Sequence, residues 1–485
     1  MPLLSAGHSI RFMPLATLFV LAGCTTLPAD RGLSNVNDLI QARDSSLTIS
    51  PATHPVSDPT NQSVETLLAK PLTAENAQTV AFLLNPRVRL TYAQLGLNQA
   101  DWVEASRLSN PVLSLSAMRS NVDSDSTKIG FGIVQNFTDI LFIRSRKQLA
   151  GAELKRTYAE AALSLQQLAL EVNTAYFEAV AFNQIAQMRT LIAKAAGASA
   201  ELAKRFHAAG NISALELARE SAQAEQAQLD QEAASAHAVA AKMTLNQLMG
   251  LTIATEWQLE ASLPLPVTDE TPLQELIHLG HQQRLDLIAE RTQIERSERI
   301  LSLAKTLRWV PFLQIGVDAE RDFDRSRSLG PNVALELPLF GKSRSGVLRA
   351  QAFQEYAQAR VHQLESEVAH GVAKAYTAMS SAHSRVDRHR HGLMPQREAI
   401  VARMQELQNY MLIGQFELLL AKQEEYNAYE SYLMALKDYW LARIALSKAV
   451  GGELPSDTKI GERNVSPIIL PSSTPPAAPH HDHHH

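Results

Sequence analysis

Two stretches of the chain, RFHAAGNISALEL (205–217) and YMLIGQFELLL (410–420), break long helical segments at a glycine. Before the first break, residues 138–206 contain no proline, and apolar residues recur every three or four positions, as on one face of an α-helix. At 1.5 Å per residue, that helix would be about 100 Å long. The sequence therefore predicts long helices that reverse direction at Gly210 and Gly414.

Two shorter helices complete the first part of this pattern. One should run from the first break to Gly250, and another should cover about 281–308. Their summed length is close to that of the helix at 138–206, so they could stack end to end beside it. The proline-containing segment 251–280 would then form a belt around the middle of the molecule.

The second part of the chain should repeat the long helix. Residues of about 342–410 read as helical, with a kink expected near Gly392 and Pro395, because proline removes a helix hydrogen bond. Apolar and aromatic residues in 426–444 then recur in steps of three and four. This spacing is typical of coiled-coil packing.

Several landmarks return in the same order about 200 residues later, which indicates two structurally similar halves. The matched pairs are Pro111 and Pro311, Ala175-Tyr176 and Ala375-Tyr376, Gly210 and Gly414, and Gly250 and Gly451.

Each half also contains a pair of predicted β-strands. We expect strands at about 111–119, 127–137, 311–320 and 331–340. The last shows the clearest alternation, with Val333, Leu335, Leu337 and Leu339 on one face. Strands of about 9–11 residues with this period are typical of transmembrane β-barrels. A four-stranded sheet capping a soluble helical domain fits the same pattern, so the strands alone leave both alternatives open.

The amino terminus is typical of a secreted protein. Residues 13–24, MPLATLFVLAGC, are an apolar run too short to span a bilayer, preceded by Arg11. Leu21-Ala22-Gly23-Cys24 resembles a bacterial lipobox, which implies cleavage before Cys24 and acylation of this residue, the only cysteine. Acyl chains would anchor the mature protein in a membrane, and Thr25 after the cysteine favours the outer membrane. The alternative is a free cysteine in an ordinary signal peptide.

The composition excludes several classes of protein. The chain of 485 residues is 45% hydrophobic, 6% aromatic and has a formal net charge of -5, which gives no reason to expect nucleic-acid binding. Motifs of nucleophilic hydrolases, P-loops, dinucleotide-binding loops and zinc proteases are absent from the sequence, so we expect neither an enzyme nor a cofactor.

Membrane strands would require an oligomer. Four strands cannot close a barrel, and an open sheet edge in lipid leaves unpaired backbone groups that cost several kcal/mol each. Two copies would supply about eight strands and a filled interior, whereas three would supply about twelve and leave room for a channel.

The chain resembles the TolC-like outer-membrane factors, the exit ducts of efflux pumps and type I secretion systems. The resemblance lies in residues 85–116, 205–218, 331–351 and 410–452, and in their order and spacing over about 64–452. It implies a homotrimer whose four strands per chain complete a 12-stranded transmembrane barrel, continued by a long α-helical barrel in the periplasm. It also implies a periplasmic adaptor and an inner-membrane transporter as partners. The sequences of these segments most resemble those of lipoprotein members linked to heavy-metal or copper resistance.

This reading divides the chain into five parts. They are a signal peptide (1–23), a lipid-anchored tether (24–63), a first repeat (64–260), a second repeat (261–452) and a disordered tail (453–485).

By the same resemblance, the two helix breaks would be the tips that contact the adaptor. The tip residues carried over are Arg205, Gly210, Asn211, Ile212, Tyr410, Gly414 and Gln415. The simpler alternative is that both glycines only end helices with a positive φ.

Family members often narrow the periplasmic mouth with acidic residues six positions after the tip glycine. Glu216 fits that spacing from Gly210, but Leu420 stands at the corresponding distance from Gly414. Glu417 and Glu424 share one helix face there and are the other candidates for an acidic gate. A solvated helix face is the alternative.

Two groups of histidines could bind metal ions. The tail ends in His480, His481, His483, His484 and His485, which could capture divalent metals weakly if they are not an expression tag. His383, His389 and His391 lie among arginines and are expected on a solvated helix face.

The sequence thus predicts a lipid-anchored outer-membrane efflux channel that conducts substrate passively, heavy-metal ions such as copper being one candidate. A type I secretion duct has the same architecture. A lipid-anchored periplasmic coiled-coil scaffold is a third reading, although it would leave the apolar strand faces exposed.

Overall fold

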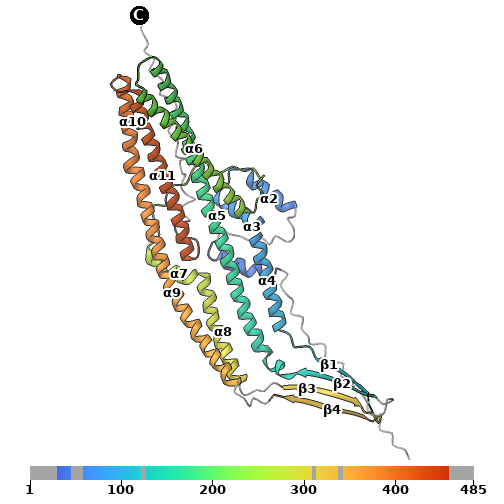
Figure 1. Cartoon of the computed structure of the whole chain (residues 1–485). Helices are drawn as coiled ribbons and strands as arrows, with labels where there is room; N and C mark the ends of the chain where they lie inside the picture. The colour runs from blue at the N-terminus through green and yellow to red at the C-terminus, as the bar shows by residue number, and fades with distance from the viewer. Residues whose placement is uncertain are drawn as a thin grey trace, which may run out of the picture.

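The protein is an elongated rod of lengthwise helices with a β-sheet at one end (Figure 1). The computed structural model describes residues 30–44, 58–119, 121, 127–307, 313–336 and 342–457. The predicted signal peptide, Cys24, the terminal histidines, Leu337 and Leu339 lie outside these ranges.

Most of the predicted elements are present. The helices are α1 (Leu33–Gln41), α2 (Asp58–Leu68), α3 (Ala74–Leu84), α4 (Pro86–Ala105), α5 (Phe137–Ala208), α6 (Ala214–Met249), α7 (Leu273–Gln283), α8 (Leu285–Leu307), α9 (Lys342–Arg388), α10 (Met394–Asn409) and α11 (Gln415–Val450). The strands are β1 (Val112–Arg119), β2 (Thr127–Asn136), β3 (Leu313–Arg321) and β4 (Arg327–Leu335).

Helix α5 is the spine of the rod. Its 72 residues confirm the predicted uninterrupted helix, and Ile185, Met188 and Ile192 are buried on one face as their spacing indicates. Helices α4, α6, α8 and α11 all pack against it. A helix this long depends on such tertiary packing, because propensity alone contributes little net stability.

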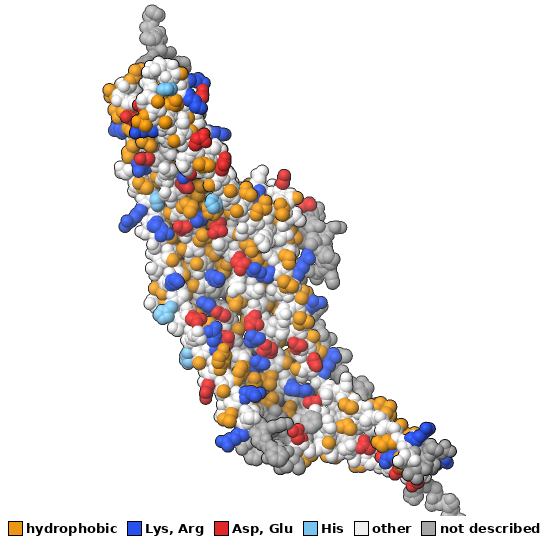
Figure 2. All heavy atoms as spheres, viewed as in Figure 1, with side chains coloured by type: hydrophobic (Ala, Val, Ile, Leu, Met, Phe, Trp, Pro, Cys, Tyr) orange, Lys and Arg blue, Asp and Glu red, His pale blue; other side chains and the backbone are white. Residues whose placement is uncertain are grey.

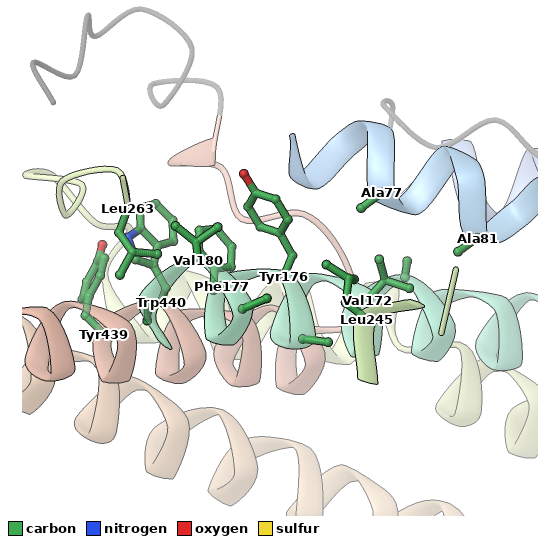
Figure 3. Close-up of a cluster of buried hydrophobic side chains, with 14 of the residues drawn as sticks. Ala77, Ala81, Val172, Tyr176, Phe177, Val180, Leu245, Leu263, Tyr439 and Trp440 are labelled. Atoms are coloured by element: carbon green, nitrogen blue, oxygen red, sulfur yellow. The ribbon is translucent and has the colours of Figure 1, made fainter. Parts of the chain in front are cut away.

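The core is concentrated at mid-length, where α3, α5, α6 and α11 meet the belt (Figure 3). Phe177 of α5 stacks on Trp440 of α11 with ring centroids 4.9 Å apart. The Trp440 indole donates a hydrogen bond to the carbonyl of Pro264 in the belt, at 2.8 Å. Each buried aromatic ring therefore joins segments that are far apart in the sequence.

The helix stacking differs from the expectation. The carboxyl end of α6 meets the start of α4, not α8: Asn85 donates to the Leu248 carbonyl at 2.6 Å and accepts from the Arg87 amide at 2.8 Å. One side chain thus caps the end of α6 and the beginning of α4. At the other junction, Gly451 after α11 lies against Arg284, at the start of α8.

The predicted irregularity near Gly392 is a π-helical stretch, His389–Leu393, between α9 and α10. Pro395 lies in the first turn of α10, where its missing N–H disturbs the hydrogen-bond ladder least.

The four strands form an antiparallel sheet in the order β1-β2-β3-β4. β4 begins four residues earlier than predicted, because the turn after β3 is closed tightly by Asp322 and Ser326, whose backbone groups bond at 3.0 Å. Pro331, which suggested a strand start, lies within β4 opposite Val317. Within the sheet of the single chain β4 is an edge strand, where a residue without an N–H is tolerated.

The sheet has one apolar and one polar face. The register places Leu115 beside Phe131, and Val317 beside Ile133, on the same side. These side chains are exposed, Leu115 to 72%. The opposite face carries Ser114, Gly132 and Asp318, with Asn332 donating to Asp318 at 2.7 Å.

Part of the predicted tether is folded. Helix α1 buries Leu33, Val36 and Ile40 and contacts α5. Arg43, just after α1, donates to the Gln283 carbonyl at 2.5 Å, and its own carbonyl accepts from the Glu453 amide at 2.9 Å. The prediction missed α1 because a helix of nine residues shows too few turns for its period to stand out.

A buried ionic cluster holds the belt and the end of the described chain to α11. The Arg443 side chain is 5% exposed; its Nε donates to Glu270 at 2.8 Å, and it also pairs with Asp457. Ser456 and Tyr439 donate to the same Glu270 carboxylate at 2.6 and 2.9 Å. Burial alone would raise the pKa of Glu270, but the hydrogen bonds and charge of Arg443 outweigh it and hold this pKa below its ordinary value.

The junction of α6 and α4 predicts unequal costs for two glycine substitutions. Gly250 has a φ of +74°, and an added Cβ would lie 2.8 Å from the Leu84 backbone, so Gly250→Ala should lower stability by about 1 kcal/mol or more. Gly197→Ala is the control: nothing lies within 4 Å of its Cβ position inside α5, and the change should be neutral or stabilising. Thermal unfolding would measure the stability of both variants. An equal loss of stability in Gly250→Ala and Gly197→Ala would contradict the close packing described at Gly250.

The Glu270 cluster predicts a stability that depends on pH. Because the folded-state pKa is depressed, this carboxylate contributes stability that is complete above its unfolded value near 4.5 and is lost as the pH falls through the folded value. Glu270→Gln should therefore lower the unfolding temperature clearly at pH 7. The difference from wild type should shrink as the pH falls below about 4.5. A difference in unfolding temperature between wild type and Glu270→Gln that does not change with pH would show that the charge of Glu270 does not contribute to stability.

Candidate functional site

The first helix reversal is built by hydrogen bonds around Gly210. This glycine has a φ of +79°, and the Asn211 amide donates to the Phe206 carbonyl at 2.8 Å, which closes the end of α5. Ser213 then starts α6 in a capping box: its hydroxyl accepts from the Glu216 amide at 3.2 Å, and the Glu216 carboxylate accepts from the Ser213 amide at 2.7 Å. Arg205, Asn211 and Ile212 lie at this turn as predicted.

The second reversal uses a different residue from the one expected. Met411, not Gly414, has the positive φ, at 57°, and the Leu412 amide donates to the Leu407 carbonyl at 2.9 Å. Gly414 is the N-cap of α11 with an extended backbone, φ -76° and ψ 158°. The idea that Gly414 ends its helix with a positive φ is therefore wrong.

This difference changes which residues of the two turns correspond. Gly210 matches Met411 in conformation, and Ser213 matches Gly414 as N-cap. Glu216 and Glu417 then occupy the same place, the third position of α6 and of α11. The apparent contrast between Glu216 and Leu420 came from aligning two glycines that are not equivalent.

The two turns meet at one end of the rod (Figure 1). Phe206 of α5 and Phe416 of α11 make an edge-to-face contact with ring centroids 6.4 Å apart. About two turns further along α11, the amides of Gln223 and Gln423 are hydrogen-bonded, which joins α6 to α11. The predicted tip residues are therefore brought together as one surface.

That surface is unusually apolar for a pair of exposed turns. Its large exposed apolar residues are Leu215, Tyr410, Met411 and Leu412, and Met411 is 92% exposed. Figure 2 shows hydrophobic side chains gathered at this end of the rod. We call these four residues the tip patch. Sequence reasoning missed Leu215, Met411 and Leu412, although the strong apolar character of YMLI in a turn was a usable signal.

The three candidate gate residues have different surroundings. Glu216 is bound in the capping box, and the hydrogen bonds from the Ser213 backbone and hydroxyl lower its pKa. Glu424 forms an ion pair with Arg397 of α10, and Glu417 is exposed on α11. In the single chain these carboxylates therefore do not form one acidic cluster, and their role as a gate stays a prediction.

A charged link further along the rod joins three helices. Arg189 of α5 pairs with Asp230 of α6 at 3.4 Å and also with Glu430 of α11. Its side chain is half-buried, so this contact is screened less than a surface ion pair. It holds the α5–α6 hairpin to α11 between the tip and the core.

No helix among the described residues is both long and apolar enough to cross a bilayer. The sheet lies at the end of the rod opposite the two helix reversals (Figure 1), and its apolar side chains are exposed there.

The carboxyl-terminal part of the described chain matches a known protein family. The model of the family described as "Outer membrane efflux protein" matches residues 276–452, from α7 to the end of α11. The chain is 23% identical over 295 residues to the cobalt-zinc-cadmium resistance protein CzcC of Cupriavidus metallidurans, covering 60% of this chain and 68% of that protein.

Solved structures share the fold over most of the chain. The outer membrane protein VceC of Vibrio cholerae superposes with a TM-score of 0.63 at 17% identity, covering 78% of this chain and 96% of that one. CusC, described as forming a transmembrane channel, superposes with a TM-score of 0.64 at 13% identity, covering 78% and 92%. The sequence match thus identifies residues 276–452 as an outer membrane efflux protein domain, and the solved structures show that most of the chain has the fold of these outer membrane proteins.

Proposed function

We propose that this chain is the outer-membrane exit duct of a tripartite efflux system that exports heavy-metal ions. The observation that carries the proposal is the apolar, exposed face of the sheet at one end of a rod whose other end presents the tip patch. Moving such an apolar face from water into lipid lowers the free energy by about 25 cal/mol for each Å² of apolar surface. The helical part would then extend from the membrane into the periplasm.

The duct would be a homotrimer with the polar sheet face lining its lumen. In the described part of the chain, β1 and β4 each have a partner strand on one side only. Joining β1 of one copy to β4 of the next satisfies these edges, and three copies give about twelve strands, enough for an open channel. The similar junctions at Gly250 and Gly451 support a two-fold internal repeat that would give six helix hairpins around the trimer.

The tip patch would dock a periplasmic adaptor, which links the duct to an inner-membrane transporter. Exposed apolar residues on rigid turns are typical of a protein-binding surface. Arg205, Gly210, Asn211, Ile212, Tyr410, Gly414 and Gln415 remain the proposed contact residues, now joined by Met411 and Leu412. Acylated Cys24 would add a lipid anchor in the outer membrane.

The likeness to CzcC favours cobalt, zinc and cadmium ions as substrates, and we keep copper as a further candidate because the likeness is distant. The duct itself would be passive, with energy supplied by the transporter.

Deleting the gene should test the export of metals. We expect the deletion strain to accumulate zinc, cobalt or cadmium and to grow poorly on their salts, with recovery when the wild-type gene is restored. Copper salts and hydrophobic drugs should be compared in parallel. Normal metal content with loss of a secreted protein would instead support the type I secretion duct.

Placing a charge in the tip patch should uncouple the duct from its adaptor. Met411→Asp should leave the protein in the outer membrane but fail to restore metal resistance, because the carboxylate would be desolvated in the docked interface. Ile253→Asp is the matched control, since Ile253 is 83% exposed in the belt, far from the tip along the chain. If Met411→Asp and Ile253→Asp restored metal resistance equally, docking of the adaptor through the tip patch would be contradicted.

A further inference from the structure

The apolar face of the sheet ends in arginines on the side farthest from the helices (Figure 1). Arg321, the last residue of β3, lies directly opposite Arg327, the first residue of β4. Side chains alternate between the two faces of a strand, so both arginines lie on the apolar face with Leu329. Arg119, the last residue of β1, lies on the same face as Leu115 for the same reason. Figure 2 shows Lys and Arg side chains gathered at this end of the rod, and we call these three residues the outer arginines.

The outer arginines are exposed and have no carboxylate partner within the part of the chain that the structure describes. The acids nearest to them along the strands are engaged elsewhere. Lys128, on the opposite and polar face, pairs with Glu320 and lies 3.9 Å from Asp322. Asp324, in the turn between β3 and β4, accepts a hydrogen bond from the Ser326 amide at 2.8 Å. The acids are thus used on the polar face and in the turn, and the apolar face keeps an uncompensated positive charge.

The pairing of Arg321 with Arg327 is unfavourable without an anion. Like charges directly opposite each other on neighbouring strands destabilise the strand pair. A phosphate group between the two guanidinium groups would remove this repulsion. The planar, forked donors of arginine also match the oxygens of phosphate, which they can bind in pairs.

The outer arginines also stand at the height where lipid headgroups would lie. From Leu313 to Arg321, β3 advances by about 27 Å, at about 3.4 Å per residue. With the strand tilt of about 40° that is typical of membrane barrels, this length spans about 20 Å along the membrane normal, close to the roughly 25 Å of an apolar band. The arginines would therefore contact headgroups, while the apolar residues before them contact acyl chains.

The charge and the surroundings of the pair favour a phosphate monoester on a lipid. A monoester carries a charge of about −1.5 to −2 at pH 7, which balances two arginines better than the single charge of a phosphodiester. Leu329 is 77% exposed and follows Arg327 on the same face. A ligand with acyl chains would cover this side chain, whereas a free phosphate ion would leave it in water.

We propose that the outer arginines bind the phosphate monoesters of an acylated glycolipid in the outer leaflet of the membrane. The inference rests on the proposed duct, since it requires the sheet to lie in the outer membrane and the helices to lie in the periplasm. Joining β4 of one copy to β1 of the next would carry the row of arginines around the barrel. Such a row would fix the depth at which the barrel sits in the membrane, because basic residues are held at the level of the anionic headgroups.

Binding of lipid A to the purified, detergent-solubilised full chain would test the proposal, measured by native mass spectrometry. Lipid A is the probe because it carries phosphate monoesters and acyl chains. The double variant Arg321→Gln/Arg327→Gln should bind it about 25-fold more weakly than wild type, since each basic residue near an anionic surface contributes about fivefold. Wild type should bind dephosphorylated lipid A at least as weakly as the double variant binds lipid A.

Lys128→Gln is the matched control, because it removes a positive charge at the same end of the sheet but from the polar face. It should change lipid A binding by less than about twofold, in contrast to the fivefold expected for one outer arginine. Circular dichroism should establish that each variant is folded.

Equal lipid A binding by wild type and the double variant would overturn the proposal. Displacement of lipid A by an equal concentration of inorganic phosphate would also overturn it, because the site would then recognise free phosphate rather than a lipid. The experiment measures no transport. A negative result would therefore leave metal export standing, and failed metal export would leave the lipid contact standing.

Discussion

The exposed apolar face of the four-stranded sheet is the constraint on which the rest of the molecule depends. Side chains such as Leu115, Phe131 and Val317 lie on one side of the sheet, while Ser114 and Asp318 lie on the other. This arrangement is favourable where one side meets an apolar medium and the other meets water. If the sheet enters lipid as proposed, the outer edges of β1 and β4 would need further strands, because backbone groups cannot stay unpaired in lipid.

The helices extend this sheet into a rigid rod, and their contacts explain how the two ends can act together. Helix α5 follows β2 directly and ends at the tip, so one helix connects the sheet to the tip patch. The Arg443–Glu270 cluster fixes the belt to α11 at mid-length, and Arg189 joins α5, α6 and α11 nearer the tip. The proposed passive duct would need this rigidity more than a reactive site.

The sequence predicted the long helices well because helix length and apolar spacing are local properties. Phe137–Ala208 agrees closely with the expected 138–206, and Gln415–Val450 begins after the expected break and contains the coiled-coil spacing at 426–444. The end-to-end partner of α6 could not be predicted, because it depends on the contact of Gly250 with Asn85, which no local pattern encodes. At the second tip, Met411 adopts the positive φ that sequence reasoning assigns to glycine, since the surrounding hydrogen bonds outweigh its strain.

The central claim is that copies of this chain assemble into an open duct through a membrane. Conductance of the purified protein in planar lipid bilayers tests it most directly. The account predicts discrete steps of uniform size once the assembled protein inserts. The absence of steps, together with release of the protein from membranes when its lipid anchor is removed, would contradict the duct and support a periplasmic scaffold.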